Sequence, residues 1–99
     1  MNVIRGVLFS QDVTLNTAND HQTDISLATT RSGWNGLVSV SAVHVSGGAA
    51  VIVFGDEVQP IPVDANSSYE GVINVRVLDT MHVSSGSVDA VIRVLIEIL

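Results

Sequence analysis

The chain ends in a regular alternation of side chains, Val88-Asp89-Ala90-Val91-Ile92-Arg93-Val94-Leu95-Ile96-Glu97-Ile98-Leu99. An apolar side chain stands at every second position, which is the period of a β-strand, and helical spacing explains neither set of side chains. The set predicted to face a core comprises Val88, Ala90, Ile92, Val94, Ile96 and Ile98. A strand over residues 88–99 would run for about 40 Å at ~3.3 Å per residue, so we expect it to bend or to extend beyond its own protomer.

The other face of this strand mixes aliphatic and charged side chains. Because only 14% of the chain is charged, the exposed aliphatic residues would form an adhesive surface patch. A symmetric homo-oligomer would bury them, with Arg93 paired to Glu97 or Asp89 of another copy. The predicted contacts between copies are Val91, Arg93, Leu95, Glu97 and Leu99. The alternative is that a second sheet of the same chain, through Arg76, covers this face.

The same two-residue period predicts strands elsewhere in the chain. Residues 36–45 and 71–78 each place three apolar side chains on one face, namely Val38, Val40 and Ala42, and Ile73, Val75 and Val77. The other predicted strands are residues 3–9, 25–29, 49–54 and 58–63, with a brief edge strand at residues 13–15. Residues 58–63 belong on a sheet edge, because Pro60 and Pro62 cannot donate ladder hydrogen bonds.

Turn residues divide these strands from one another. Ser46-Gly47-Gly48 predicts a tight β-hairpin between residues 36–45 and 49–54, because glycine supplies positive φ at little steric cost. The predicted loops are residues 10–24, 64–70 and 79–87.

Composition agrees with an all-β chain. Eighteen valines and eight isoleucines make β-branched aliphatic residues about a quarter of the 99 residues, and these residues favour strands over helices. A chain of this length predicts one domain over residues 1–99. We predict a single-domain antiparallel β-sandwich or jelly roll of about seven to eight strands, with a small barrel as a further possibility.

Charge and hydropathy exclude several partners. Four Arg and no Lys against ten acidic residues give a net charge of −6, so the cations that grip nucleic acid or an anionic membrane are scarce. No apolar run approaches the ~20 residues that span a bilayer. Arg5 and Gly6 interrupt the apolar N-terminal stretch, which argues against a signal peptide. These features predict a soluble protein, cytoplasmic or part of a particle.

Metal and cofactor sites are not indicated. His21, His44 and His82 have no spacing that would place two imidazoles on one metal, and we expect His44 to be a partly buried, hydrogen-bonded imidazole. The loop residues Asp56-Glu57 and Asp64-x-Asn66 miss the calcium-loop pattern. Asx residues in loops commonly hydrogen-bond within turns, so we predict turn chemistry there, no metal and no cofactor.

Catalytic motifs are equally absent from the sequence. There is no Cys, and the eleven Ser include no G-x-S-x-G elbow. We therefore predict that the chain is not an enzyme. The alternative function is a carbohydrate-binding or lectin-like β-sandwich, in which Trp34 and Tyr69 act as ligand platforms with the Asp56 and Asp64 loops. Trp34 could instead cover an open end of the sandwich.

Three runs of sequence resemble a class of viral proteins: residues 49–56, residues 69–78 and the terminal residues 90–99. In texture they resemble the small accessory structural proteins of tailed bacteriophage virions, which are capsid decoration or cement proteins and short tail-associated proteins. The resemblance implies a β-sandwich that forms a homo-oligomer, often a trimer. It also implies a place in the virion, on a protein lattice such as a capsid, without catalysis.

Overall fold

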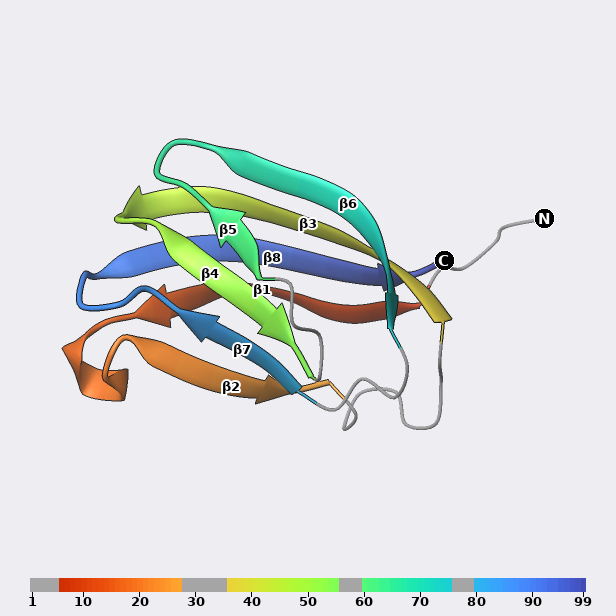
Figure 1. Ribbon diagram of the computed structural model, residues 1–99, viewed down its shortest axis with the longest axis horizontal. Helices are drawn as coiled ribbons and strands as arrows, with labels where there is room; N and C mark the ends of the chain where they lie inside the picture. The colour runs from red at the N-terminus through yellow and green to blue at the C-terminus, as the bar shows by residue number, and fades with distance from the viewer. Residues whose placement is uncertain (1–5, 28–35, 56–59, 76–79) are drawn as a thin grey trace.

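The described residues form eight strands and one 3-10 turn (Figure 1). The computed structural model describes residues 6–27, 36–55, 60–75 and 80–99. Trp34, Arg76, Asp56 and Glu57 lie outside these ranges. The elements are β1 (Val7–Leu15), η1 (Thr17–Asn19), β2 (Gln22–Ser26), β3 (Gly36–Gly47), β4 (Ala50–Phe54), β5 (Ile61–Val63), β6 (Ser68–Val75), β7 (Thr80–Ser84) and β8 (Ala90–Ile98). The all-β prediction and the predicted number of strands are confirmed.

The strands form two four-stranded sheets. Sheet A has the order β1-β8-β3-β6 and sheet B the order β2-β7-β4-β5. The pairs β1·β8, β2·β7, β3·β6 and β4·β5 are all antiparallel and alternate between the two sheets. They are related as if one long antiparallel hairpin had been rolled into two layers, which is the jelly-roll arrangement.

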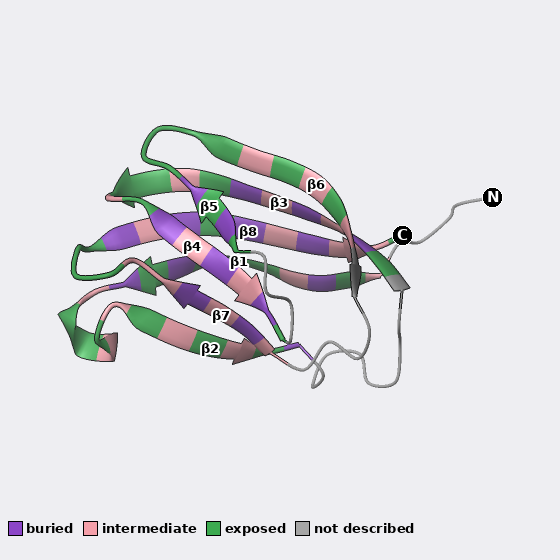
Figure 2. Cartoon of the chain, in the orientation of Figure 1, coloured by how far each residue is buried: buried purple, intermediate pink, exposed green. Residues whose placement is uncertain are grey.

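The core lies between the two sheets and is built from alternate side chains of the strands, seen as purple bands in Figure 2. Its buried members are Leu8, Val13, Leu15, Leu27, Val38, Val40, Ala42, Ala50, Ile52, Phe54, Ile61, Val63, Met81, Val83, Ala90, Ile92, Val94 and Ile96. All of them are apolar, so their burial removes hydrocarbon surface from water without leaving a polar group unpaired.

The terminal strand β8 is central in sheet A, between β1 and β3. The predicted inner face is confirmed, because the even-numbered residues of β8 up to Ile96 are buried. Val88 precedes the strand and is 47% exposed, and Ile98 is half-buried. Regular pairing therefore covers nine residues, which is shorter than the run of alternation in the sequence.

The predicted hairpin at Gly47-Gly48 is wrong. The chain does reverse there, but β3 belongs to sheet A and β4 to sheet B, so the glycines carry the chain from one layer to the other. Gly47 has φ +80, and a Cβ on it would lie 2.1 Å from the carbonyl oxygen of Asp89. Gly48 N–H donates to that same oxygen at 2.9 Å. Both glycines thus bring the crossing chain against the start of β8.

All three predicted loops overlap strands, and β6 already begins at Ser68 within residues 64–70. In residues 10–24, β1 continues to Leu15 as an edge strand and β2 begins at Gln22. In residues 79–87, β7 buries Met81 and Val83. The prediction for the proline-containing segment is confirmed, since β5 is an edge strand and Pro62 is exposed on it.

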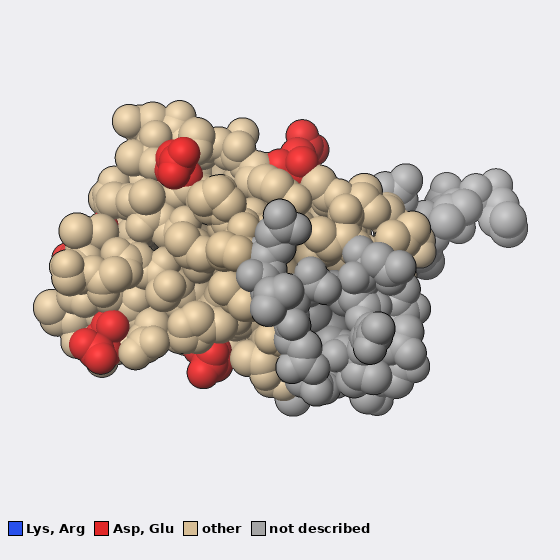
Figure 3. Space-filling model, viewed as in Figure 1, with Lys and Arg blue, Asp and Glu red and all other residues tan. Residues whose placement is uncertain are grey.

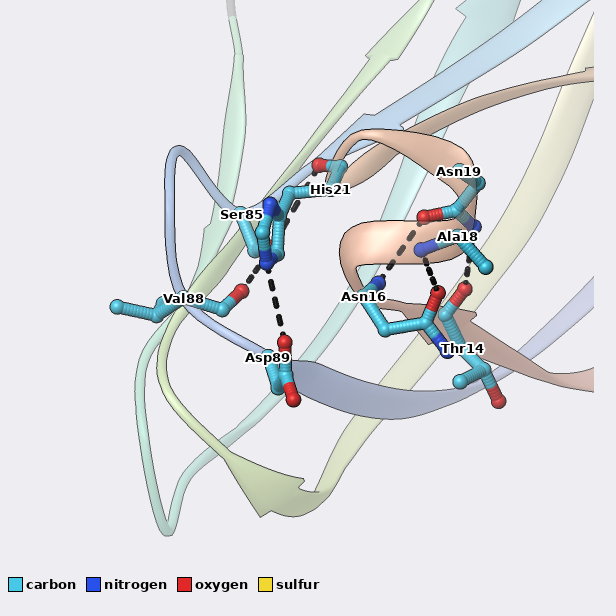
Figure 4. A network of polar contacts seen from close by, with 8 residues as sticks. All are labelled: Thr14, Asn16, Ala18, Asn19, His21, Ser85, Val88 and Asp89. Carbon is cyan, nitrogen blue, oxygen red and sulfur yellow. Dashed lines mark hydrogen bonds and ion pairs between the residues drawn. The ribbon is translucent and has the colours of Figure 1, made fainter.

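Polar side chains tie the turns at one end of the sandwich (Figure 4). Asn16 caps η1 by accepting from Ala18 N–H at 3.0 Å, while Asn19 Oδ1 accepts from Asn16 N–H at 3.0 Å. His21 Nε2 lies 3.0 Å from Asp89 Oδ1. Ser85 Oγ donates to the carbonyl of Val88 at 2.6 Å. These contacts hold the β1–β2 turn against the β7–β8 turn.

Candidate self-association surface

The outward-facing side chains of sheet A form ordered rows across its strands. Register pairs place three complete rows across the order β1-β8-β3-β6. They are Val7-Glu97-Ser39-Val72, Ser10-Leu95-Ser41-Glu70 and Asp12-Arg93-Val43-Ser68. Thr14-Val91 and Leu37 extend these rows at either end. This surface is called the outer face of sheet A below.

Aliphatic side chains are concentrated on the outer face of sheet A. Among the described residues, seven large hydrophobic side chains are exposed, and five of them lie here: Val7, Leu37, Val43, Val72 and Leu99. Leu99 follows β8, and its N–H donates to the carbonyl of Leu37 at 3.2 Å. Leu95 and Val91 are half-buried in the middle of the sheet. Serines and charged side chains stand between these aliphatic groups, so the surface mixes aliphatic and polar side chains.

One ion pair stands within this surface. Arg93 Nε donates to Asp12 Oδ1 at 2.8 Å, and a second guanidinium nitrogen lies 3.4 Å from Asp12 Oδ2. The hydrogen bond from Arg93 lowers the pKa of the Asp12 carboxyl group, and the same contact raises the pKa of Arg93. Arg93 is the one Lys or Arg among the described residues, and its charge is balanced inside its own chain.

The structure places all five predicted contact residues at this surface. Val91, Leu95 and Glu97 are half-buried, while Arg93 and Leu99 are exposed. Every described strand belongs to sheet A or sheet B, so no described element packs over the outer face of sheet A. Sequence reasoning missed Asp12 as the partner of Arg93. The two residues are 81 positions apart, and no local pattern indicates that β1 and β8 are neighbours.

The residues of the alternative ligand site have a different setting. Tyr69 is half-buried against the core, and a Cβ on Gly71 would lie 2.4 Å from its hydroxyl oxygen. The tyrosine ring therefore lies along β6 in the space that Gly71 leaves open. Trp34 lies outside the described residues.

The three histidines are separate from one another, and each has a hydrogen-bonding partner. His82 Nδ1 lies 2.6 Å from Asp24 Oδ1 on the outer side of sheet B. His44 is half-buried; its Nε2–H donates to Gly47 O at 2.9 Å and its Nδ1 accepts from Asn66 N–H at 3.0 Å. The prediction for His44 is confirmed. Among the described residues, no group of three or more His, Cys, Asp or Glu is arranged to hold a metal ion.

The turn prediction at Asp64-x-Asn66 is confirmed. Ser67 N–H and Ser67 Oγ both donate to the carbonyl of Asp64, at 3.1 and 2.8 Å. Asn66 has φ +61, a left-handed conformation that asparagine tolerates better than most residues. The turn is tied to β3 through His44.

A shallow groove opens along the other side of the sandwich, where β1 and β2 are the edges of their sheets. It has a volume of about 290 Å³. Its lining comprises Phe9, Gln11, Asp12, Val13, Thr14, Thr23 and Ile25. On the face of the molecule seen in Figure 3, the charged side chains of described residues are all Asp or Glu.

Comparisons with known proteins add little to this geometry. No protein-family model matches the chain, and no curated protein matches it. The coat protein of Tobacco streak virus is a solved structure similar to this chain, with a TM-score of 0.49 and 14% sequence identity. The similarity covers 96% of this chain and 84% of that chain. Among the described residues, no helix is long and apolar enough to cross a membrane. Function therefore has to be inferred from this chain's own residues.

Proposed function

We propose that this chain is a non-enzymatic structural protein that acts by self-association and by contact with a protein lattice. The observation that carries the proposal is the outer face of sheet A, where five exposed aliphatic side chains share one surface with the Arg93–Asp12 ion pair, Glu70 and Glu97. Aliphatic side chains in this number are costly to leave in water and need apolar partner groups. A second copy of the same chain supplies the same chemistry, so a symmetric contact satisfies it.

The size of the surface supports this contact. Four strands about 4.8 Å apart and about eight residues long, at ~3.3 Å per residue, present roughly 500 Å² in projection. Two copies would bury about 1,000 Å², which is the lower bound of specific interfaces. A contact of this size is weak alone and becomes useful when many copies sit on a repeating surface.

We place the chain among virion accessory proteins, as a capsid decoration or stabilising protein of a tailed bacteriophage. Two features support this placement. The jelly-roll order is common in viral capsid domains, although it is also found in lectins and other proteins. The sequence also resembles phage accessory proteins in its β-rich, weakly charged texture. On this proposal the chain is part of the virion and a trimer is the expected assembly.

The test compares matched substitutions on the two sheets by light scattering at micromolar concentration. Leu95→Glu places a charge in the middle of the outer face of sheet A, and Val51→Glu does the same at a half-buried position on sheet B. We expect the wild-type chain and Val51→Glu to form an oligomer, and Leu95→Glu to lose mass while keeping the circular dichroism of a folded β protein. A wild-type chain that stays at 10.4 kDa overturns the proposal, as does a Leu95→Glu variant with the mass of the wild type.

A further inference from the structure

The four sheet edges differ in how they are protected against pairing with another chain. Proline, charge and short length are the usual protection. Strand β5 has three residues and includes Pro62, and β2 has five residues. Strand β6 carries the charge of Glu70, and Gly71 in its interior weakens a strand. Strand β1 is the longest edge, with nine residues, no proline and no lysine.

The charge on β1 does not protect it. Asp12 is the one charged residue of the strand, and Arg93 of the neighbouring strand already balances it. The remaining side chains are aliphatic, aromatic or neutral and polar. Past the irregularity between Val7 and Phe9, the β1 edge at Ser10 and Asp12 therefore has neither proline nor an uncompensated charge to keep another strand away.

The direction of the free backbone groups follows from one hydrogen bond. The carbonyl of Thr14 accepts from Asn19 Nδ2 at 2.8 Å, so it points away from β8 and towards the free edge (Figure 4). Backbone groups in a strand alternate sides, so Ser10 and Asp12 also turn theirs outward. Gln11 then lies between two residues that can form hydrogen bonds to a new strand.

The groove beside β1 gives the new strand something to cover. Phe9 and Val13 on β1 and Ile25 on β2 supply its apolar surface, and Phe9 and Ile25 are only half-buried. A strand added at the β1 edge would bring its own inward-facing side chains next to these groups. The free energy gained from apolar contact would thus add to that of the backbone hydrogen bonds.

We propose that β1 pairs antiparallel with β1 of a second copy, about a two-fold axis at Gln11. Gln11 is the midpoint of Val7–Leu15, and this register pairs the regular part of the strand, Phe9 to Val13, which lies past the irregularity between Val7 and Phe9. Phe9 stands opposite Val13 of the other copy, which closes the groove, and the two Gln11 amides meet on the axis. Ser10 and Asp12 of opposite copies form the hydrogen-bonded pairs, which gives each carboxylate a hydroxyl neighbour.

Other registers that keep the same faces aligned are poorer. An axis at Asp12 places two carboxylates directly opposite each other, and like charges at opposed positions are destabilising. An axis at Ser10 places Leu8, inside the irregularity between Val7 and Phe9, opposite Asp12 of the other copy. The register centred on Gln11 avoids both defects.

This contact goes beyond the proposed function because it uses a different part of the molecule. Pairing of the β1 edges joins the two copies of sheet A into one eight-stranded sheet. The outer faces of both copies then lie on the same side and stay uncovered. A chain with an edge contact and a face contact can make both at once, as a protein that covers a lattice needs.

Cysteine cross-linking tests the edge contact directly, because the chain has no cysteine of its own. Residues opposed in a non-hydrogen-bonded pair have Cα atoms about 4.5 Å apart, within the range that a disulfide spans. The test uses Gln11→Cys in a Leu95→Glu background, so that the face contact cannot produce the cross-link. The controls are Gln22→Cys, which replaces an exposed glutamine on the β2 edge, and Ser10→Cys, which shifts the thiol by one position.

We expect disulfide-linked dimer to form at least tenfold faster with Gln11→Cys than with either control under the same mild oxidation. Equal rates at Gln11 and Gln22 would show random collision and overturn the proposal. Faster cross-linking at Ser10 than at Gln11 would overturn the register and the proposal with it. These outcomes are independent of whether Leu95→Glu changes the mass of the chain, so the edge contact and the proposed function can fail separately.

Discussion

Both faces of β8 carry aliphatic side chains, but their surroundings differ. The inner face places Ile92, Val94 and Ile96 at 0% exposure against the opposite sheet. The outer face carries Val91 and Leu95, which are half-buried only by their neighbours in sheet A. The comparison shows that aliphatic side chains on one strand can be fully buried on its inner face and only half-buried on its outer face.

The largest expected effect is on the inner face. Ile92→Asp would bury a carboxylate among aliphatic side chains with no partner, which costs far more than the few kcal/mol of a marginal domain. We expect no cooperative unfolding transition for this variant in circular dichroism. Leu95→Asp on the outer face is the matched control and should fold. A soluble, cooperatively folded Ile92→Asp variant would show that the two faces have been exchanged.

A milder pair of substitutions measures the same difference. Ile92→Ala should lower the free energy of unfolding by about 2 to 5 kcal/mol, because it leaves a cavity in a packed core. Leu95→Ala should cost less than about 1 kcal/mol when measured on dissociated chains. Urea denaturation checks both values. Equal losses would mean that the outer face is as fully packed within one chain as the inner face.

The side of a strand that faces the core could be predicted from the sequence, but the strands beside it could not. The two-residue period identified the inner faces of β3 and β8 correctly, since the pattern depends only on neighbouring residues. Whether the strand after Gly47 pairs with β3 depends on which strands already lie beside β3, and those are β6 and β8. Gly47-Gly48 indicates a reversal, and nothing local distinguishes a hairpin from a crossing between layers.

The candidate surface shows the same limit. The alternating pattern placed the five predicted contact residues on one face of the last strand. The rows of side chains on the outer face of sheet A also include residues from β1, β3 and β6. Asp12 lies in a stretch that is polar enough to be predicted as a loop. Strand β7 was missed because its alternating pattern is short. It has only two buried residues, Met81 and Val83, and the residues beside them, Thr80, His82 and Ser84, are polar.

The crossing at Gly47 provides a further test of how β8 is held. Gly47→Ala would introduce a Cβ at φ +80 and 2.1 Å from a backbone oxygen, so the crossing chain must move away from β8. We expect a loss of about 1 to 3 kcal/mol in the free energy of unfolding. Gly86→Ala has a similar positive φ of +73 with nothing nearby, so it isolates the backbone cost. An equal loss in both variants would contradict close packing at Gly47.

His44 makes a smaller contribution at the same end of β3. His44→Ala removes both hydrogen bonds of the imidazole and frees the turn at Asn66, which should cost about 1 to 2 kcal/mol. His82→Ala, whose imidazole lies on the outer side of sheet B, is the comparison. Denaturation together with hydrogen exchange at Asn66 would show whether the loss is local. An unchanged hydrogen-exchange rate at the Asn66 amide would argue against a stabilising hydrogen bond from this amide to His44.

The ion pair on the outer face should have the smallest effect. The pKa of Asp12 is lowered in the folded chain by the hydrogen bond from Arg93, so its stabilisation is present above the usual carboxylate range and is lost as the pH falls below about 4. Because both groups are exposed, we expect Asp12→Asn to flatten the acid limb of the stability curve only slightly. A large loss at pH 7 would mean that the pair is shielded from solvent.

The association of the outer face is tested most directly by the unfolding temperature at several protein concentrations. A folded chain that self-associates gains stability by mass action as its concentration rises. We expect the midpoint of the wild-type chain to rise steadily between about 1 and 100 μM, and that of Leu95→Glu to rise much less over the same range. Midpoints of the wild-type chain that are independent of concentration would contradict the account, because the outer face of sheet A would then remain exposed in the native protein.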